Sequence, residues 1–213
     1  MDTSEHDIPA DTYETLVHAT LVALIKQGYS DLTVRDIDEE WEKSRQLINY
    51  YFDGKDELLT TVLIDLIETG QEFLDIDEPD NPYSQLKAAV DAFLIEPEDE
   101  DIRYWEFLTA IYEMQSQAHR HPDYAAVFNQ ISDESITSIA EIIEAGIDQG
   151  QFRPVDSVAV ATFIDDTVTG AHVKKIHLGQ DEAPLHARKM IHEFVIQPLL
   201  TDEVSVISDP TDE

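Results

Sequence analysis

The sequence predicts an all-α protein of about nine helices, in which three short N-terminal helices precede a larger helical bundle. Apolar residues recur with the period of a helix along most of the 213-residue chain, and no useful stretch alternates as a strand does. Its nine prolines and seven glycines divide it into helix-sized segments. In chain order, the expected helices cover residues 11–27, 34–41, 44–51, 55–74, 83–95, 102–118, 123–148, 157–178 and 185–200.

The ends of the first four helices are predicted from single residues. Gly28 stands where a helix commonly ends in a residue with positive φ. Thr33 is a predicted N-cap because Asp36 follows three residues later, a variant of the capping box. Ser44 and Asp53 are predicted to cap the third and fourth helices in the same way.

The remaining five helices are longer and form the bundle. In the last of them, apolar residues and one proline recur at i, i+1, i+4, i+5, i+8 and i+9, from Met190 to Leu199. The predicted organisation is a flexible N-terminus (1–10), a three-helix domain (11–54), the bundle (55–200) and an acidic disordered tail (201–213).

The charge of the chain restricts its surroundings. It has 13 Lys and Arg against 46 Asp and Glu, a formal net charge of −33. In dilute buffer such a chain repels nucleic acids and anionic membranes, but at molar salt the Debye length falls to about 3 Å. Because lysine is scarce and the acids are spread along the whole chain, we favour a protein of a halophilic archaeon over an acidic protein of an ordinary cell.

Several classes of function are excluded or disfavoured. The chain has no cysteine, which excludes disulfides, thiolate metal sites and cysteine nucleophiles. It shows no secretory signal and no apolar run near the roughly 20 residues of a membrane span, so we expect a cytoplasmic protein without a membrane partner. We expect no catalytic residues, cofactor or metal, since no catalytic or nucleotide-binding fingerprint is present and the histidines around Pro122 are typical of an exposed loop.

The second and third helices form a predicted helix-turn-helix, since about three residues separate them. The third begins with Ser44, Arg45 and Gln46, polar groups at the end where a recognition helix meets base edges. Tyr50 and Tyr51 offer hydroxyl groups suited to phosphate.

Two further residues are candidates for phosphate contacts. Lys55 and Thr33 stand at helix N-termini, which favour phosphate. On spacing alone, exposed basic residues of an ordinary helical bundle are an equally good interpretation.

Three stretches resemble the TetR family of transcriptional regulators: Gly28-Tyr29, residues 32–37 (LTVRDI) and residues 50–59 (YYFDGKDELL). The stretch 48–59 is most similar to the betaine-regulator branch. The resemblance implies a homodimer with an N-terminal DNA-binding domain and a C-terminal ligand-binding and dimerisation domain. It places four residues in the major groove, namely Arg45, Gln46, Leu47 and Asn49, and four on the DNA backbone, namely Thr33, Tyr50, Tyr51 and Lys55.

The turn of the helix-turn-helix departs from this family. The family usually has a small residue, a glycine and an apolar residue there, whereas this chain has Trp41, Glu42 and Lys43. Asp38, Glu39 and Glu40 would also face phosphates if they point outward. These departures keep an alternative open, a TetR-like helical interaction module that has lost DNA binding.

The resemblance also implies an effector pocket and a dimer interface in the bundle. The candidate pocket residues are Phe93, Trp105, Leu108, Tyr112, Phe163 and Thr167. They suit an apolar or aromatic molecule, or a quaternary ammonium held by cation–π attraction. The candidate interface residues are Phe163, Val168, Met190, Phe194 and Leu199. The expected function is a ligand-responsive repressor that a small molecule releases from a pseudo-palindromic double-stranded DNA operator.

Overall fold

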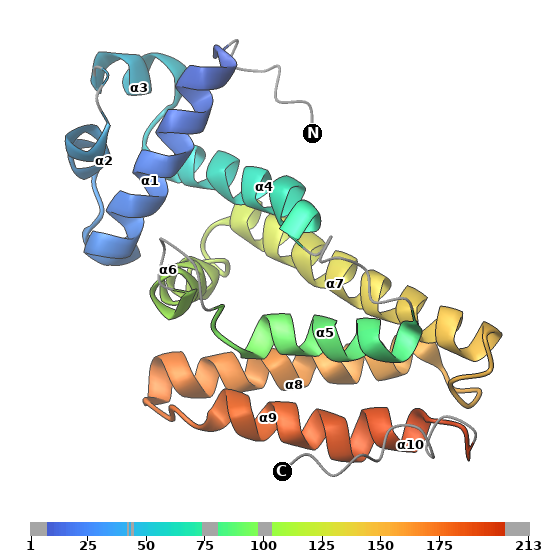
Figure 1. Ribbon diagram of the computed structural model, residues 1–213. Coiled ribbons are helices and arrows are strands. Elements are labelled where there is room, and N and C mark those ends of the chain that lie inside the picture. Colours follow the sequence, from blue (N-terminus) through green and yellow to red (C-terminus); the bar gives the residue numbers. More distant parts are fainter. Residues whose placement is uncertain (1–7, 42, 44, 74–80, 98–103, 203–213) are drawn as a thin grey trace. The chain divides into compact units, whose positions relative to one another are not determined.

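The computed structural model describes residues 8–41, 43, 45–73, 81–97 and 104–202. Over these residues the chain forms nine separate helices and no strand beyond the isolated bridge of Phe152 with Leu200, so the all-α prediction is confirmed. The helices are α1 (Ala10–Asp31), α2 (Val34–Glu40), α3 (Arg45–Tyr51), α4 (Lys55–Phe73), α5 (Pro82–Leu94), α6 (Tyr104–Ser116), α7 (Pro122–Asp148), α8 (Ser157–Leu178) and a last helix made of α9 (Ala183–Ile191), η2 (His192–Ile196) and α10 (Gln197–Leu199) (Figure 1).

The chain packs as two compact units. Unit 1 comprises residues 1–72 and 100–128, and unit 2 comprises residues 73–99 and 129–213. Unit 1 therefore holds α1 to α3 together with α6, most of α4 and the first turns of α7. The division predicted after residue 54 instead separates α1 to α3 from all later helices. It remains a prediction about which residues bind DNA.

Two of the predicted signals at the ends of the N-terminal helices, Gly28 and Thr33, are confirmed, and the side-chain cap at Asp53 stays a prediction. Gly28 has φ 71° and interrupts α1, so the last residues of that helix form a separate turn. Thr33 and Asp36 form a complete capping box at the start of α2. Ser44, the predicted cap of α3, lies outside the described residues. At the start of α4 the backbone N–H of Asp53 donates a hydrogen bond to the Glu57 carboxylate.

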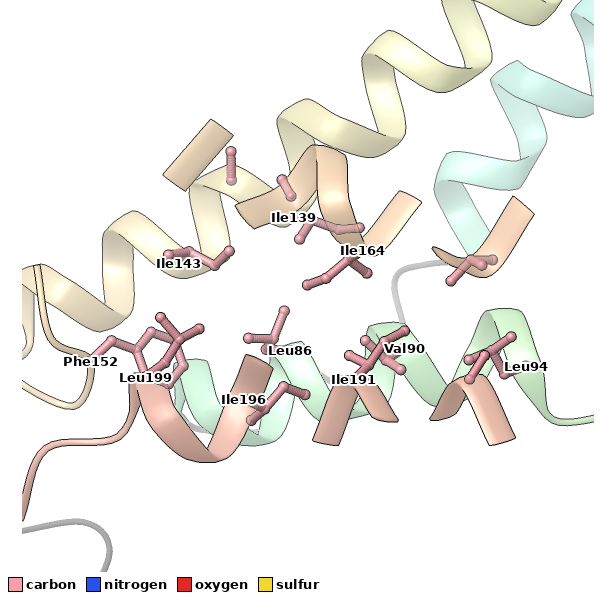
Figure 2. Close-up of a cluster of buried hydrophobic side chains, with 14 of the residues drawn as sticks. Leu86, Val90, Leu94, Ile139, Ile143, Phe152, Ile164, Ile191, Ile196 and Leu199 are labelled. Carbon is pink, nitrogen blue, oxygen red and sulfur yellow. The ribbon is translucent and has the colours of Figure 1, made fainter. Parts of the chain in front are cut away.

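The core of unit 2 joins helices that are far apart in the sequence. Leu86, Val90 and Leu94 of α5 are buried against α7, α8 and the last helix (Figure 2). Phe152, between α7 and α8, closes one end of this core. A Cβ atom at Gly146 would lie 2.0 Å from its ring, so only glycine fits beneath it.

The last helix differs from the prediction of one regular helix over residues 185–200. Its middle, His192–Ile196, is a π-helical turn. Pro198 follows within α10, and in a regular α-helix its ring would clash with the carbonyl of the residue four positions earlier. The wider turn that precedes it relieves this clash. A proline near the end of a helix predicts an irregular backbone there, but it does not predict that the irregularity is a π-helical turn.

Candidate nucleic-acid interface

The short helix α3 presents one polar face. Arg45, Gln46, Asn49 and Tyr50 are exposed, and Tyr50 is 78% exposed. Ile48 is fully buried and fixes the opposite face. Leu47 and Tyr51 are half-buried, and the ring of Tyr51 meets that of Tyr50 edge-on at 5.0 Å. The sequence-predicted groove residues of this helix thus share its outer side, with Leu47 at its edge.

Lys55 and Thr33, the other predicted backbone contacts, both have partners within unit 1. The ammonium of Lys55 donates to the carbonyls of Tyr29 at 2.8 Å and Leu32 at 3.0 Å. The hydroxyl of Thr33 donates to the Asp36 carboxylate at 2.5 Å. Hydrogen bonds from Thr33 lower the pKa of the Asp36 carboxyl, so this helix cap stays charged in mildly acidic solution.

The acidic residues of α2 are partly neutralised by cations. Arg35 pairs with Glu39 at 3.0 Å, and Lys26 of α1 pairs with Glu40 at 2.7 Å. Surface pairs of this kind contribute little to stability, but each places a cation beside a carboxylate that a phosphate would otherwise meet. Asp38, which precedes these two glutamates, is half-buried.

A polar network joins the end of α1 to α4, α6 and α7. The backbone N–H of Tyr29 donates to Glu113 of α6 at 2.7 Å. The hydroxyl groups of Tyr29 and Tyr124 both donate to Asp56 of α4, at 3.1 and 3.3 Å. Burial, and to a lesser degree the Asp56 carboxylate, raises the pKa of both phenols, so they remain neutral donors.

Sequence reasoning missed this network for a physical reason. Gly28-Tyr29 and Asp56 belong to stretches that resemble the family, but their partners Glu113 and Tyr124 lie in helices more than fifty residues later. Gly28 is the residue in the sequence that hints at this contact. A Cβ atom there would lie 3.0 Å from the Glu113 carboxylate, in addition to the cost of its positive φ.

The candidate effector residues divide between the two units. Trp105, Leu108 and Tyr112 lie half-buried along one side of α6, in unit 1. Phe93, Phe163 and Thr167 belong to unit 2. Thr167 lines a groove of about 550 Å³ between α8 and α9, together with residues that include Lys174, Asp181 and His186.

The candidate interface residues are of two kinds. Phe163, Met190 and Phe194 are exposed by 55, 53 and 69%, an unusual degree for large apolar side chains. Val168 and Leu199 are instead buried in the core of unit 2. The exposed members lie on α8, α9 and η2, where Val158, Leu178 and Leu185 are also exposed.

Among the described residues, no group of three or more His, Asp or Glu side chains is arranged to hold a metal ion. No helix among these residues is long and apolar enough to cross a membrane.

Comparison with known proteins places the chain in a family. Residues 16–62 match "Bacterial regulatory proteins, tetR family", and residues 82–198 match "BetI-type transcriptional repressor, C-terminal". The HTH-type transcriptional repressor NicS of Pseudomonas putida is 23% identical over 147 residues, which span 67% of this chain and 66% of NicS, just under two thirds of its length.

Solved structures of transcriptional regulators have a similar fold. A TetR transcription regulator from Haloarcula marismortui is 29% identical, with a TM-score of 0.81 over 91% of this chain and 100% of that one. A transcriptional regulator from Saccharomonospora viridis in complex with choline is 18% identical, with a TM-score of 0.74 over 87% of this chain and 98% of that one.

The chain belongs to the TetR family of transcriptional regulators, and its C-terminal region is of the BetI repressor type. The family resemblance predicted from the sequence is therefore confirmed. Regulators of this family bind DNA operators, dimerise and bind small-molecule effectors; the family is one of regulators rather than enzymes.

Proposed function

We propose that this protein is a homodimeric repressor that a small molecule releases from its operator in the cytoplasm. One observation carries the proposal: Arg45, Gln46, Asn49 and Tyr50 share the exposed face of α3, whose other face is anchored by the buried Ile48. This is the arrangement that lets a short helix enter a major groove and reach base edges. Residues 11–54 would form the DNA-binding domain and residues 55–200 the ligand-binding and dimerisation domain.

The operator of such a dimer would be pseudo-palindromic. Two copies of α3 related by a two-fold axis would read half-sites about 34–36 Å apart, one turn of DNA. The ion pairs of Glu39 and Glu40 support DNA binding over a helical module that has lost it, because these acids do not stand unopposed at the interface.

Fluorescence anisotropy on the gene's own upstream DNA would test this proposal. In about 2 M KCl, we expect the wild type to prefer that DNA to a scrambled duplex. Arg45→Ala should weaken binding at least tenfold, the loss of roughly one base contact. Arg120→Ala is the matched control, since it removes the same charge from an exposed position between α6 and α7, outside the helix-turn-helix. If selection from fragments of the whole genome also yields no bound duplex, the interaction module is the better interpretation.

For the effector we propose a quaternary ammonium compound. Trp105 and Tyr112 place two aromatic rings on one side of α6, and such rings attract this cation without a carboxylate. The choline complex of the S. viridis regulator shows that this fold accommodates such a compound in one case. Calorimetry should detect choline binding to the wild type and not to Trp105→Leu. The neutral isostere 3,3-dimethylbutan-1-ol is the control, and equal binding of both compounds would contradict the cation–π assignment.

A further inference from the structure

Two threonines of α1 hold the turn between α2 and α3. The indole N–H of Trp41 donates a hydrogen bond to Oγ1 of Thr15 at 3.1 Å. The ammonium of Lys43 donates to Oγ1 of Thr12 at 2.7 Å. Trp41 is 5% exposed and Thr12 7% exposed, whereas Thr15 and Lys43 are exposed, so each bond joins one buried and one exposed side chain. The turn is therefore tied to α1 on both sides of residue 42.

The hydroxyl of Thr15 is oriented for this bond. It donates its own proton back to the carbonyls of Asp11 and Thr12, each at 3.0 Å, as helical threonines commonly do. Its oxygen lone pairs are then left to accept, and the indole N–H, which can only donate, takes one of them. Valine has the same shape but offers no acceptor, so it tests the bond with little change in packing.

The hydrogen bonds of Trp41 and Lys43 to α1 matter because α3 is short and few buried side chains hold its first residues. The helix has seven residues, and its fully buried residue, Ile48, is the fourth of them. Arg45 and Gln46, at its beginning, are exposed. A glycine usually shapes the turn in this family, whereas here the extended backbone of Trp41 ends α2 at φ −108° and ψ 123°. The side-chain bonds of Trp41 and Lys43 thus fix the end of α3 that carries Arg45 and Gln46.

We propose that Thr12 and Thr15 are positioning residues for operator recognition, which act through Lys43 and Trp41 on the start of α3. The inference rests on the proposed function and deepens it, because it names what aims the recognition helix in a turn without glycine. It also gives Lys43 a structural role. Its ammonium has a partner on α1, so the turn lysine aims α3 in addition to any contact with phosphate.

Operator affinity of four variants would test the role of the Trp41–Thr15 bond. We expect Thr15→Val and Trp41→Phe each to weaken operator binding about tenfold, since a misplaced α3 loses roughly one base contact. The double variant should be no weaker than either single one, because both remove the same bond. Thr20→Val is the matched control; its hydroxyl donates to the Leu16 carbonyl of its own helix, at 2.7 Å, and we expect less than a twofold effect.

A second measurement tests the bond without DNA. The chain has two tryptophans, Trp41 and Trp105, so an NMR spectrum should show two indole N–H signals. Thr15→Val should shift one signal and accelerate its exchange with water, while the Trp105 signal stays in place as an internal reference.

The two measurements separate the inference from the function beneath it. Unchanged indole exchange in Thr15→Val, wild-type operator affinity in both single variants, or additive losses in the double variant would each overturn the positioning role. If the wild type binds no duplex while indole exchange responds as expected, the bond exists but the operator function fails, and with it the role in recognition. The melting temperature of each variant should lie well above the temperature of the binding assay. The loss of operator affinity is then not caused by unfolding of the variant.

Discussion

Lys55 combines a structural role with its expected DNA contact. An ammonium has three N–H donors. The ammonium of Lys55 donates two hydrogen bonds, to the carbonyls of Tyr29 and Leu32. One donor remains for a phosphate. The cation also lies 4.6 Å from the ring centre of Tyr29, so it is held in place at the end of α1. A loss of operator binding on mutation of Lys55 would therefore not by itself prove a phosphate contact.

Tyr50→Phe and Lys55→Met should separate these roles. Tyr50 is 78% exposed, so loss of its hydroxyl should leave folding stability unchanged. We expect Tyr50→Phe to bind the operator about fivefold less tightly, the worth of one hydrogen bond, with an unchanged melting temperature. Lys55→Met should weaken binding and also lower the free energy of unfolding by about 1 kcal/mol, since two carbonyls lose a donor. Anisotropy and thermal melts would check both; an unchanged affinity of Tyr50→Phe would refute its phosphate contact.

His172 makes the stability of unit 2 depend on pH. It is 4% exposed, and its Nε2 lies 2.7 Å from the carbonyl of Phe93, which the neutral ring can bond as a donor. Burial lowers its pKa, although the bond to Phe93 partly opposes this. The unfolded chain therefore binds this proton more readily. The stabilisation is complete above the unfolded pKa near 6.5 and is lost as the pH falls below it.

The variant His172→Gln should remove that dependence. We expect the wild type to lose stability relative to His172→Gln between about pH 6.5 and pH 5, measured by denaturant melts at fixed salt. His186→Gln, an exposed histidine of α9, is the control and should follow the wild type. Because many carboxyl groups titrate nearby, the difference between variants is the relevant quantity. Parallel curves for the wild type and His172→Gln would contradict the assignment.

At the scale of helices, local signals predict boundaries well and long-range contacts poorly. The capping box of α2 and the glycine at the end of α1 act within a few residues, so the sequence reveals them. The bounds of α8 follow equally from Asp156, whose side chain accepts from the N–H of Ala159, and from Gly179 in the left-handed conformation. The partner of the Tyr29 N–H, in contrast, comes from α6, and no local pattern announces it.

The candidate interface shows the same limit. On α8, apolar residues occur on several sides, among them Phe163, Ile164 and Val168. Periodicity then cannot say which side faces the core of its own chain. In the structure Ile164 and Val168 enter that core, whereas Phe163 stays exposed. For α3 the polar and apolar sides are distinct, and its exposed face follows directly from the sequence.

Glu113 is predicted to hold the end of α1 against α6. Its carboxylate accepts the Tyr29 N–H, the first after the interruption at Gly28. Glu113→Ala leaves this part-buried N–H without an acceptor, so we expect a loss of about 1–3 kcal/mol. For a chain of this size that lowers the melting temperature by several degrees, about 2–4 °C per kcal/mol. Glu113→Gln keeps an acceptor and should lose less. Gln115→Ala, exposed on the same helix, is the control, and an equal shift in it would contradict the role.

For the whole molecule, net charge and self-association oppose each other. Each chain carries −33, and a homodimer would bring two such charges together. The apolar side chains that would pair, Phe163, Met190 and Phe194, share unit 2 with the acidic groove residues Asp166, Asp181 and Glu182. Apolar contact gains about 25 cal/mol per Å² and depends little on ionic screening, whereas repulsion between the acids extends about 10 Å at 0.1 M salt and about 3 Å at 1 M.

The proposed dimer should therefore depend on salt. We expect light scattering to show a dimer in about 2 M KCl, with a shift toward monomer and a lower melting temperature in 0.1 M KCl, where the charges repel over a longer range. Sucrose in 0.1 M KCl separates the causes, because it strengthens apolar burial but screens no charge, and it should not restore the dimer fully. Phe194→Ser should stay monomeric in 2 M KCl, which would tie association to this apolar face. A wild-type dimer equally stable at both salt concentrations would show that apolar contact alone outweighs the repulsion.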